Sequence, residues 1–254
     1  MDIFKAFFVA VSTYSALPVP QFSWTEKTMR YAICFFPAVG LFCGAALWLW
    51  YVFARGLDLS PFLFSAVAAC IPLLVTGGIH MDGYMDTVDA ISSRLPRERK
   101  LEIMKDPNCG AFAVIYCAMY LLVYTALVYE SYRLELVPLL CPVFVLSRCL
   151  SGLTAVNMPN ARRSGMLCAF TQNAHKRTAN CALTIVLILS GLSLVLLRLK
   201  TGLLMLAASA LCLLLYRSMA MKNFGGATGD SFGFFLQICE LACLAAAVLG
   251  GGLL

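Results

Sequence analysis

Apolar segments recur along the whole chain, and each is close to the length of about 20 residues that an α-helix needs to cross a bilayer. Of the 254 residues, 61% are hydrophobic and only 13% are charged. A soluble domain carries about twice that charged fraction, so this composition favours a membrane protein. We predict an all-α, polytopic membrane helix bundle that forms one domain over residues 1–254. The expected transmembrane helices cover residues 31–53, 60–79, 110–129, 136–156, 179–197, 202–216 and 234–253.

The N-terminal segment does not fit this pattern. Residues 3–17 are apolar, but Lys5 interrupts them early and no small-residue cleavage site follows a clean apolar run. We therefore expect no cleavable signal peptide. An interfacial helix and a partial re-entry into the membrane both fit the segment, and the sequence leaves these two alternatives open.

The distribution of positive charge predicts the orientation. With seven transmembrane helices and a cytoplasmic N-terminus, the cytoplasmic segments hold 14 of the 19 Lys and Arg residues and the outer segments hold 4. This bias follows the positive-inside rule. It places three polar, glycine-bearing segments, residues 77–109, 157–178 and 222–233, on one side. Because the net charge of +6 is spread over loops, it indicates topology and not binding of nucleic acid.

The twelve cysteines do not form a recognisable framework. No pair has the CxxC spacing, and most cysteines stand singly inside apolar runs. In that setting cysteine is a small hydrophobic residue that lets helices pack closely. We expect neither a disulfide framework nor a zinc site.

Three aspartates form the most informative motif. Asp82, Asp86 and Asp89 stand at positions i, i+4 and i+7, directly after an apolar segment. A helix puts them within an arc of about 60°, where each pair of carboxylates about 6 Å apart repels by roughly 2–3 kcal/mol. Oxygen ligands of this kind suit Mg²⁺ or Mn²⁺. We predict that all three bind metal and act in catalysis; acidic residues near a helix N-terminus are the simpler alternative.

Other candidates surround this motif. His80 is a candidate substrate-binding residue, although a metal contact or a helix cap would also account for it. Gly77 and Gly78 are expected to end the preceding transmembrane helix and to allow close backbone approach. Segment 97–110 is expected to form a short amphipathic helix that Pro107 and Gly110 stop.

Basic residues are the candidates for phosphate binding. In segment 97–110 the best candidate is Lys105, beside Asp106. Arg148 lies inside a predicted transmembrane helix, where an arginine usually faces a polar cavity or a partner such as Glu240. Further candidates at the end of that helix are Asn157, Arg162 and Arg163.

The last polar segment, 224–233, contains four glycines before the final transmembrane helix. Its flexible backbone, with Gly226 as the candidate residue, is expected to offer N–H groups to an anion. Asp230 is expected to complete a metal site or to act as a base.

The chain resembles the cobalamin synthase family, whose members are adenosylcobinamide-GDP ribazoletransferases. The order and spacing of six segments carry the resemblance along nearly the whole chain. The matching segments are Leu17–Pro20, Phe36–Leu41, Gly77–Ala90, Leu101–Asp106 with Gly110–Phe112, Ser147–Arg148 and Gly225–Asp230. Ala90 stands where the family usually has glycine. Asn108 and Cys109 replace a run that contains a basic residue in the family, so that basic residue is missing here.

The resemblance implies a late step of cobalamin biosynthesis. A hydroxyl of α-ribazole, or of its 5′-phosphate, would attack the phosphate attached to adenosylcobinamide in adenosylcobinamide-GDP, and GMP would leave. Adenosylcobalamin, or its 5′-phosphate, would be the product. The resemblance also implies Mg²⁺ as cofactor and a location in the bacterial cytoplasmic membrane. Asp82, Asp86 and Asp89 would hold the metal, Asp230 would orient or deprotonate the hydroxyl, and Lys105 and Arg148 would counter phosphate charge.

Two other functions compete with this interpretation. A CDP-alcohol phosphatidyltransferase also clusters aspartates on membrane helices, but its motif has an Ala-Arg pair that does not follow Asp82-Gly83 here. A transporter would place carboxylates at mid-membrane depth and show an inverted repeat, whereas the acids here cluster at one end. Association with other corrinoid-assembly enzymes or with a second copy stays open.

Overall fold

The computed structural model describes residues 2–162 and 165–253, so the candidate Arg163 lies outside the described residues. Regular structure in these residues is helical, apart from one isolated β-bridge. The helices are α1 (Asp2–Tyr14), α2 (Glu26–Ala32), a 3-10 turn (Ile33–Phe35), α3 (Phe36–Gly56), α4 (Pro61–Thr76), α5 (Ile79–Ser92), α6 (Arg97–Ile103), α7 (Ala111–Arg133), α8 (Val137–Asn157), α9 (Met166–Gln172), α10 (Lys176–Leu197), α11 (Leu199–Phe224) and α12 (Gly229–Leu253).

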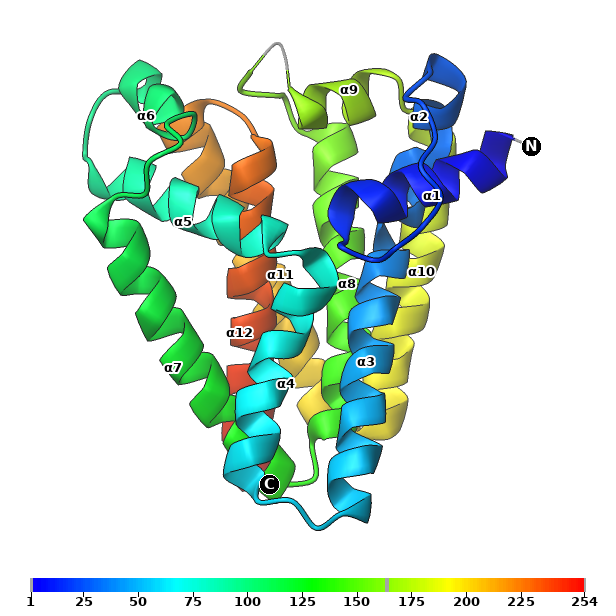
Figure 1. Ribbon diagram of the computed structural model, residues 1–254, viewed down its shortest axis with the longest axis vertical. Helices are drawn as coiled ribbons and strands as arrows, with labels where there is room; N and C mark the ends of the chain where they lie inside the picture. The colour runs from blue at the N-terminus through cyan, green and yellow to red at the C-terminus, as the bar shows by residue number, and fades with distance from the viewer. Residues whose placement is uncertain (1, 163–164, 254) are drawn as a thin grey trace.

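The long helices pack side by side in one bundle (Figure 1). Six helical segments in the described residues are long and apolar enough to cross a membrane, and α4 with α5 passes the same test only as a pair. The predicted all-α membrane bundle is therefore confirmed. Several boundaries differ from the prediction. The segment expected at 202–216 is the longer helix α11, the final helix begins at Gly229 and not at residue 234, and the helix expected at 60–79 ends early at Thr76.

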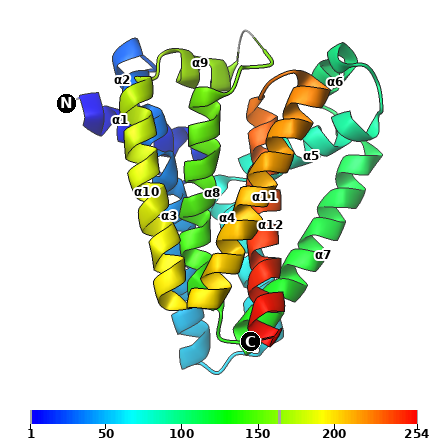
Figure 2. The same ribbon diagram turned by 180° about the vertical axis from the view of Figure 1, so that it is seen from behind.

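Two glycines turn the chain out of the bundle direction. Gly77 ends α4 with φ +64° and Gly78 precedes α5 with φ +80°, both in the left-handed region that glycine adopts without a Cβ clash. The axes of α4 and α5 differ by 94°. Helix α5 therefore lies across one end of the bundle and does not run parallel to the long helices (Figures 1 and 2).

Helix α1 lies across the same end of the bundle. It has 13 residues, too few to span a bilayer, and it runs across the bundle (Figure 1). The chain after it is anchored to α4, because the Ala16 N–H donates to the Val75 carbonyl at 2.9 Å. Helix α1 therefore does not span the bilayer by itself, and the choice between an interfacial helix and a partial re-entry for residues 3–17 stays a prediction.

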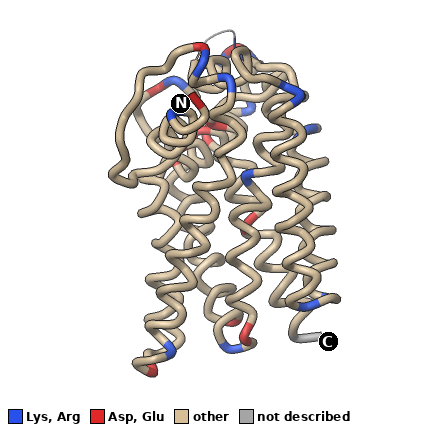
Figure 3. Tube along the Cα trace, turned by 90° about the vertical axis from the view of Figure 1, so that its right-hand side faces the viewer, with Lys and Arg blue, Asp and Glu red and all other residues tan. Residues whose placement is uncertain are grey.

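Charged residues gather mainly at this end of the bundle. Figure 3 shows Lys, Arg, Asp and Glu concentrated at the end of the bundle where the N-terminus lies, with a few at the opposite end. The three polar segments predicted to lie on one side do so: α5 and α6, the α8–α9 connection and the α11–α12 turn all meet there (Figure 2). This end is called the charged end below.

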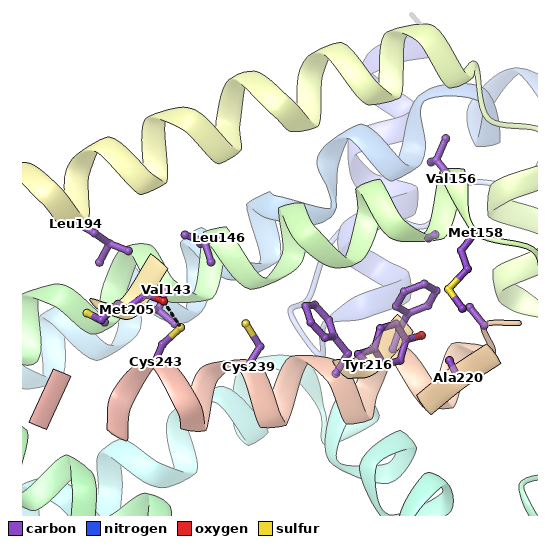
Figure 4. Close-up of a cluster of buried hydrophobic side chains, with 14 of the residues drawn as sticks. Val143, Leu146, Val156, Met158, Leu194, Met205, Tyr216, Ala220, Cys239 and Cys243 are labelled. Atoms are coloured by element: carbon purple, nitrogen blue, oxygen red, sulfur yellow. Dashed lines mark hydrogen bonds between the residues drawn. The ribbon is translucent and has the colours of Figure 1, made fainter. Parts of the chain in front are cut away.

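The core between α8, α10, α11 and α12 contains aromatic, branched and small apolar side chains (Figure 4). Cys239 and Cys243 of α12 are completely buried in it, and the Cys243 thiol donates to the Met205 carbonyl of α11 at 3.5 Å. These cysteines pack as small hydrophobic residues, as their positions inside apolar runs predicted.

One ion pair lies inside the bundle. Arg148 of α8 and Glu240 of α12 are only 1% and 3% exposed, and the Arg148 guanidinium contacts the Glu240 carboxylate directly. Ser147 donates to the same carboxylate at 2.9 Å. The predicted pairing of Glu240 with Arg148 is confirmed, and each buried charge is compensated by the other.

Candidate active site

A close helix crossing at the charged end brings two acidic segments together. A Cβ atom built on Gly83 of α5 would lie 2.7 Å from the carbonyl oxygen of Asp230, and one built on Gly233 of α12 would lie 2.6 Å from the carbonyl oxygen of His80. Only glycine at both positions lets the backbones approach this closely. Since Asp82 is next to Gly83, the crossing places the first aspartate of α5 beside the first turn of α12.

The α11–α12 turn is held against the end of α8. The Ala161 N–H donates to the Ala227 carbonyl and the Ala227 N–H donates to the Pro159 carbonyl, both at 2.8 Å. A Cβ on Gly226 would lie 2.4 Å from that Pro159 carbonyl. This bridge explains the need for Gly226, and it carries Arg162 toward α12.

The N–H of Gly226, the candidate residue of the glycine-rich turn, is not free to bind an anion, contrary to our prediction. Gly225 and Gly226 cap α11, donating to the carbonyls of Met221 and Ala220. The Ala227 N–H is used in the bridge, and the Thr228 N–H donates to the Ser231 hydroxyl at 2.9 Å. The turn is instead a helix stop followed by a capping box, because the Ser231 N–H also donates to the Thr228 hydroxyl.

A cavity of about 300 Å³ opens beside the crossing. Asp82, Asp230, Arg162, Asn160 and His80 all contribute to its lining. Arg162 Nη1 lies 3.3 Å from Asp230 Oδ2, with the two side chains 22% and 28% exposed. The cavity therefore combines two carboxylates, one guanidinium, an amide and an imidazole. These functional groups are suited to binding phosphates and hydroxyl groups.

The carboxyl group of Asp86, one turn along α5 from Asp82, is a weaker acid than an ordinary aspartate. Partial burial, together with the negative charges of Asp82, Asp230 and Asp89, raises its pKa to about 7 against the opposing effect of Arg162. A carboxyl in this state is destabilised by ionisation, and a bound cation would reverse that effect. The electrostatics of the cluster therefore favour a cation.

Asp89 faces a different hollow. It lines an open pocket of about 320 Å³ between α5 and the α6–α7 connection, together with Asp106, Asn108 and Gly110. The Asp89 carboxylate lies against Gly110, where a Cβ would approach both of its oxygens to 2.1 Å. The Asn108 N–H and amide donate to Asp106 and lower the pKa of that carboxyl.

The three aspartates of α5 therefore share a helix, as predicted, without converging on one point. In the described part of the chain, no three His, Cys, Asp or Glu side chains come close enough together to hold a metal ion. Mg²⁺ is commonly held by one or two carboxylates together with substrate phosphates and water. The oxygen donors of Asp82 and Asp86 fit that pattern, and those of Asp89 fit it less well.

Three predicted substrate-binding residues lie away from the cavity. Lys105 is exposed in the α6–α7 connection, and it lines neither hollow. Asn157 is exposed and donates to the Leu153 carbonyl and to Asn180. Arg148 is buried with Glu240, which corrects the prediction that it counters phosphate charge: the desolvated guanidinium is already neutralised inside the bundle.

The cavity also contains residues that the sequence analysis did not select. Asn160 and Thr228 line it, as do the aromatic residues Tyr14 and Phe36 from the N-terminal third of the chain. Tyr14 lies in an apolar segment, and nothing in the sequence marked it as a functional residue. Phe36 and Thr228 belong to segments that carried the family resemblance, and that was the available signal for them. Asn160 lies outside those segments and had no such signal.

Comparisons with known proteins match this chain over nearly its full length. A family model described as cobalamin-5-phosphate synthase matches residues 6–248. A protein of Lachnoclostridium phytofermentans named adenosylcobinamide-GDP ribazoletransferase is 39% identical over 254 residues, covering 100% of this chain and 97% of the relative. A Clostridium botulinum protein of the same name is 30% identical over 252 residues, covering 98% of each. No solved structure matches.

Proposed function

The chain belongs to the cobalamin-5-phosphate synthase family, and we propose that the acidic cavity between α5 and α12 is where it acts as an adenosylcobinamide-GDP ribazoletransferase. A hydroxyl oxygen of α-ribazole, or of its 5′-phosphate, forms a bond to the phosphorus attached to the cobinamide. The bond from that phosphorus to GMP breaks, and the hydroxyl proton passes to a base. The main observation in support of this proposal is that Asp82, Asp230 and Arg162 line the same cavity.

Asp230 is the base in this proposal. It lies in the first turn of α12 and is held by Arg162 Nη1 at 3.3 Å. A carboxylate fixed in this way can orient the attacking hydroxyl and accept its proton as the new bond forms. The pairing with Arg162 also limits the positions that the carboxylate can take, and positioning supplies much of the catalysis in phosphoryl transfer.

Arg162 is the cation for the phosphates, in place of Lys105 and Arg148. Its Nη2 donates to the Leu101 carbonyl of α6 at 3.1 Å, so the guanidinium is anchored between α6 and α12. An anchored guanidinium can stabilise the negative charge on a phosphate oxygen without being reorganised.

Mg²⁺ fits the donor set of Asp82 and Asp86. When bound, it would neutralise charge on the pyrophosphate and make GMP a better leaving group. The two residues would present their oxygens from successive turns of α5. The raised pKa of Asp86 supports this assignment, because an uncompensated carboxylate cluster is poorly tolerated.

The charged end faces the cytoplasm of a bacterial cell in this proposal. The excess of Lys and Arg on the segments that meet there supports that orientation, and the relatives come from bacteria. The CDP-alcohol and transporter interpretations have no support from the comparisons, since the family model covers residues 6–248.

The test is GMP release by the purified protein in detergent or liposomes. Adenosylcobinamide-GDP and α-ribazole 5′-phosphate would be supplied together and singly, with Mg²⁺ and with a chelator. We expect release only when both substrates and the metal are present. Release without the ribazole would indicate a hydrolase, and activity in the chelator would exclude the metal assignment.

A further inference from the structure

The cavity beside the acidic cluster has an aromatic wall built from three elements. The ring centroids of Tyr14 of α1 and Phe36 of α3 are 4.6 Å apart, and those of Phe36 and His80 of α5 are 5.8 Å apart. All three side chains line the cavity. A continuous wall of ring systems favours an aromatic ligand, which can stack on it or meet it edge to face.

Much of the remaining lining is small. Gly152 and Ala155 of α8, together with Ala227, Gly229 and Gly233 around the start of α12, contribute no side chain larger than a methyl group. Space is therefore kept between these residues and the rings. A cavity of about 300 Å³ is at the lower end of the range for small-molecule sites, which suits a nucleoside and excludes a whole corrinoid.

Exposure changes along the cavity. Asp82 is exposed, and Arg162 and Asp230 keep 22% and 28% of their side chains accessible. In contrast, Phe36 and Ser151 are 5% and 2% exposed. A ligand that fills this space therefore has a buried aromatic part and a polar part that reaches the charged residues.

His80 has hydrogen-bonding capacity that the protein does not use. The side chain is 5% exposed, and neither Nδ1 nor Nε2 has a hydrogen-bond partner in the described residues. Leaving buried polar atoms unpaired is unfavourable, so a site of this kind usually gains its partner from a ligand or water. The aromatic wall therefore includes one group able to recognise a polar atom on a flat ring.

We propose that this cavity binds the acceptor nucleoside, with its base against the wall of Tyr14, Phe36 and His80, and that a His80 N–H donates to the free ring nitrogen of the base. The inference rests on the proposed function. A ribazole has a planar aromatic base with one such nitrogen, and this orientation lets the sugar hydroxyls reach Asp82 and Asp230. Guanine fits less well, because its several donors and acceptors would be left unpaired against apolar residues. The donor nucleotide then lies outside this cavity.

The experiment compares steady-state kinetics of His80→Phe and His80→Gln with the unmodified protein. We expect His80→Phe to raise the KM for α-ribazole 5′-phosphate about tenfold and to leave the KM for adenosylcobinamide-GDP unchanged. His80→Gln should recover part of the loss, because its amide can donate. His175→Phe is the matched control: His175 is exposed at the start of α10 and lines neither hollow.

A ribazole analogue with C–H in place of the free ring nitrogen isolates the hydrogen bond. The unmodified protein should use it about tenfold less well than the natural substrate, whereas His80→Phe should not discriminate. Equal use of the two substrates by the unmodified protein would overturn the inference, and so would equal discrimination by His80→Phe. Failure of the unmodified protein to release GMP from both natural substrates would instead refute the proposed function.

Discussion

Gly233 of α12 lies directly on Gly83 of α5, so that a Cβ atom built on Gly233 would be 3.1 Å from the Gly83 Cα and 2.6 Å from the His80 carbonyl oxygen. The two helices belong to segments that are distant in the sequence. Their contact fixes the position of Asp82 relative to Asp230, and hence the geometry of the proposed active site.

Gly233→Ala should reduce activity more than stability. The added methyl group has no room beside the His80 carbonyl, so α5 must shift, and a displacement of about 1 Å in an active site costs on the order of 100-fold in rate. The measurement is kcat for GMP release by folded, monodisperse protein. Gly56→Ala is the matched control, because a Cβ at Gly56 meets nothing within 4 Å. Full activity of Gly233→Ala would show that the crossing does not position the site.

The raised pKa of Asp86 predicts a stability that depends on both pH and metal. A carboxyl whose pKa is about 7 when folded and about 4 when unfolded binds its proton more tightly in the folded state. Without metal, stability should therefore fall as pH rises from about 4 to 7 and level off above that range. Above about pH 7, metal-free Asp86→Asn should unfold at a higher temperature than the unmodified protein.

Mg²⁺ should reverse this loss where Asp86 is ionised. At about 100 times its Kd, a ligand specific for the folded state adds about 2.7 kcal/mol of stability. We expect Mg²⁺ to raise Tm at about pH 8, to raise it little at about pH 5 and to have little effect on Asp86→Asn. An equal rise in Tm for Asp86→Asn would remove this residue from the metal site.

The buried pair of Arg148 and Glu240 should matter for folding and not for substrate binding. Glu240→Gln leaves the Arg148 charge uncompensated inside the bundle, which typically costs 3–5 kcal/mol, whereas replacing both partners with apolar residues is often neutral. Thermal unfolding should show Glu240→Gln strongly destabilised and the double variant Arg148→Met/Glu240→Met close to the unmodified protein. A large rise in the KM for adenosylcobinamide-GDP in the folded double variant would restore the substrate role for Arg148.

The sequence predicted the membrane bundle and the acidic helix because both are local properties. Apolar length identifies helices that cross a bilayer, and the spacing of Asp82, Asp86 and Asp89 places them on one helix face. The sequence did not predict that Asp82 and Asp89 face different hollows. That division depends on the 94° bend after Gly77 and on where α12 and the α6–α7 connection pack, which are long-range relationships.

The roles of the basic residues also depend on long-range packing that the sequence does not show. Lys105, Arg148 and Arg162 were all plausible phosphate ligands by charge, and only the packing separates them. Arg148 is already paired within the bundle, Lys105 is exposed away from the cavity, and Arg162 is carried to Asp230 by the bridge between Asn160 and Ala227. Composition cannot distinguish a charge used for folding from a charge used for substrate.

The most direct test of the account is the rate of GMP release by Asp82→Asn and Asp230→Asn, measured with both substrates and Mg²⁺. Asp58→Asn is the matched control, because Asp58 is exposed between α3 and α4 and its φ of +52° suits asparagine. We expect a loss on the order of 100-fold or more for each cavity variant and normal turnover for Asp58→Asn. Normal turnover by folded Asp82→Asn and Asp230→Asn would place the active site elsewhere.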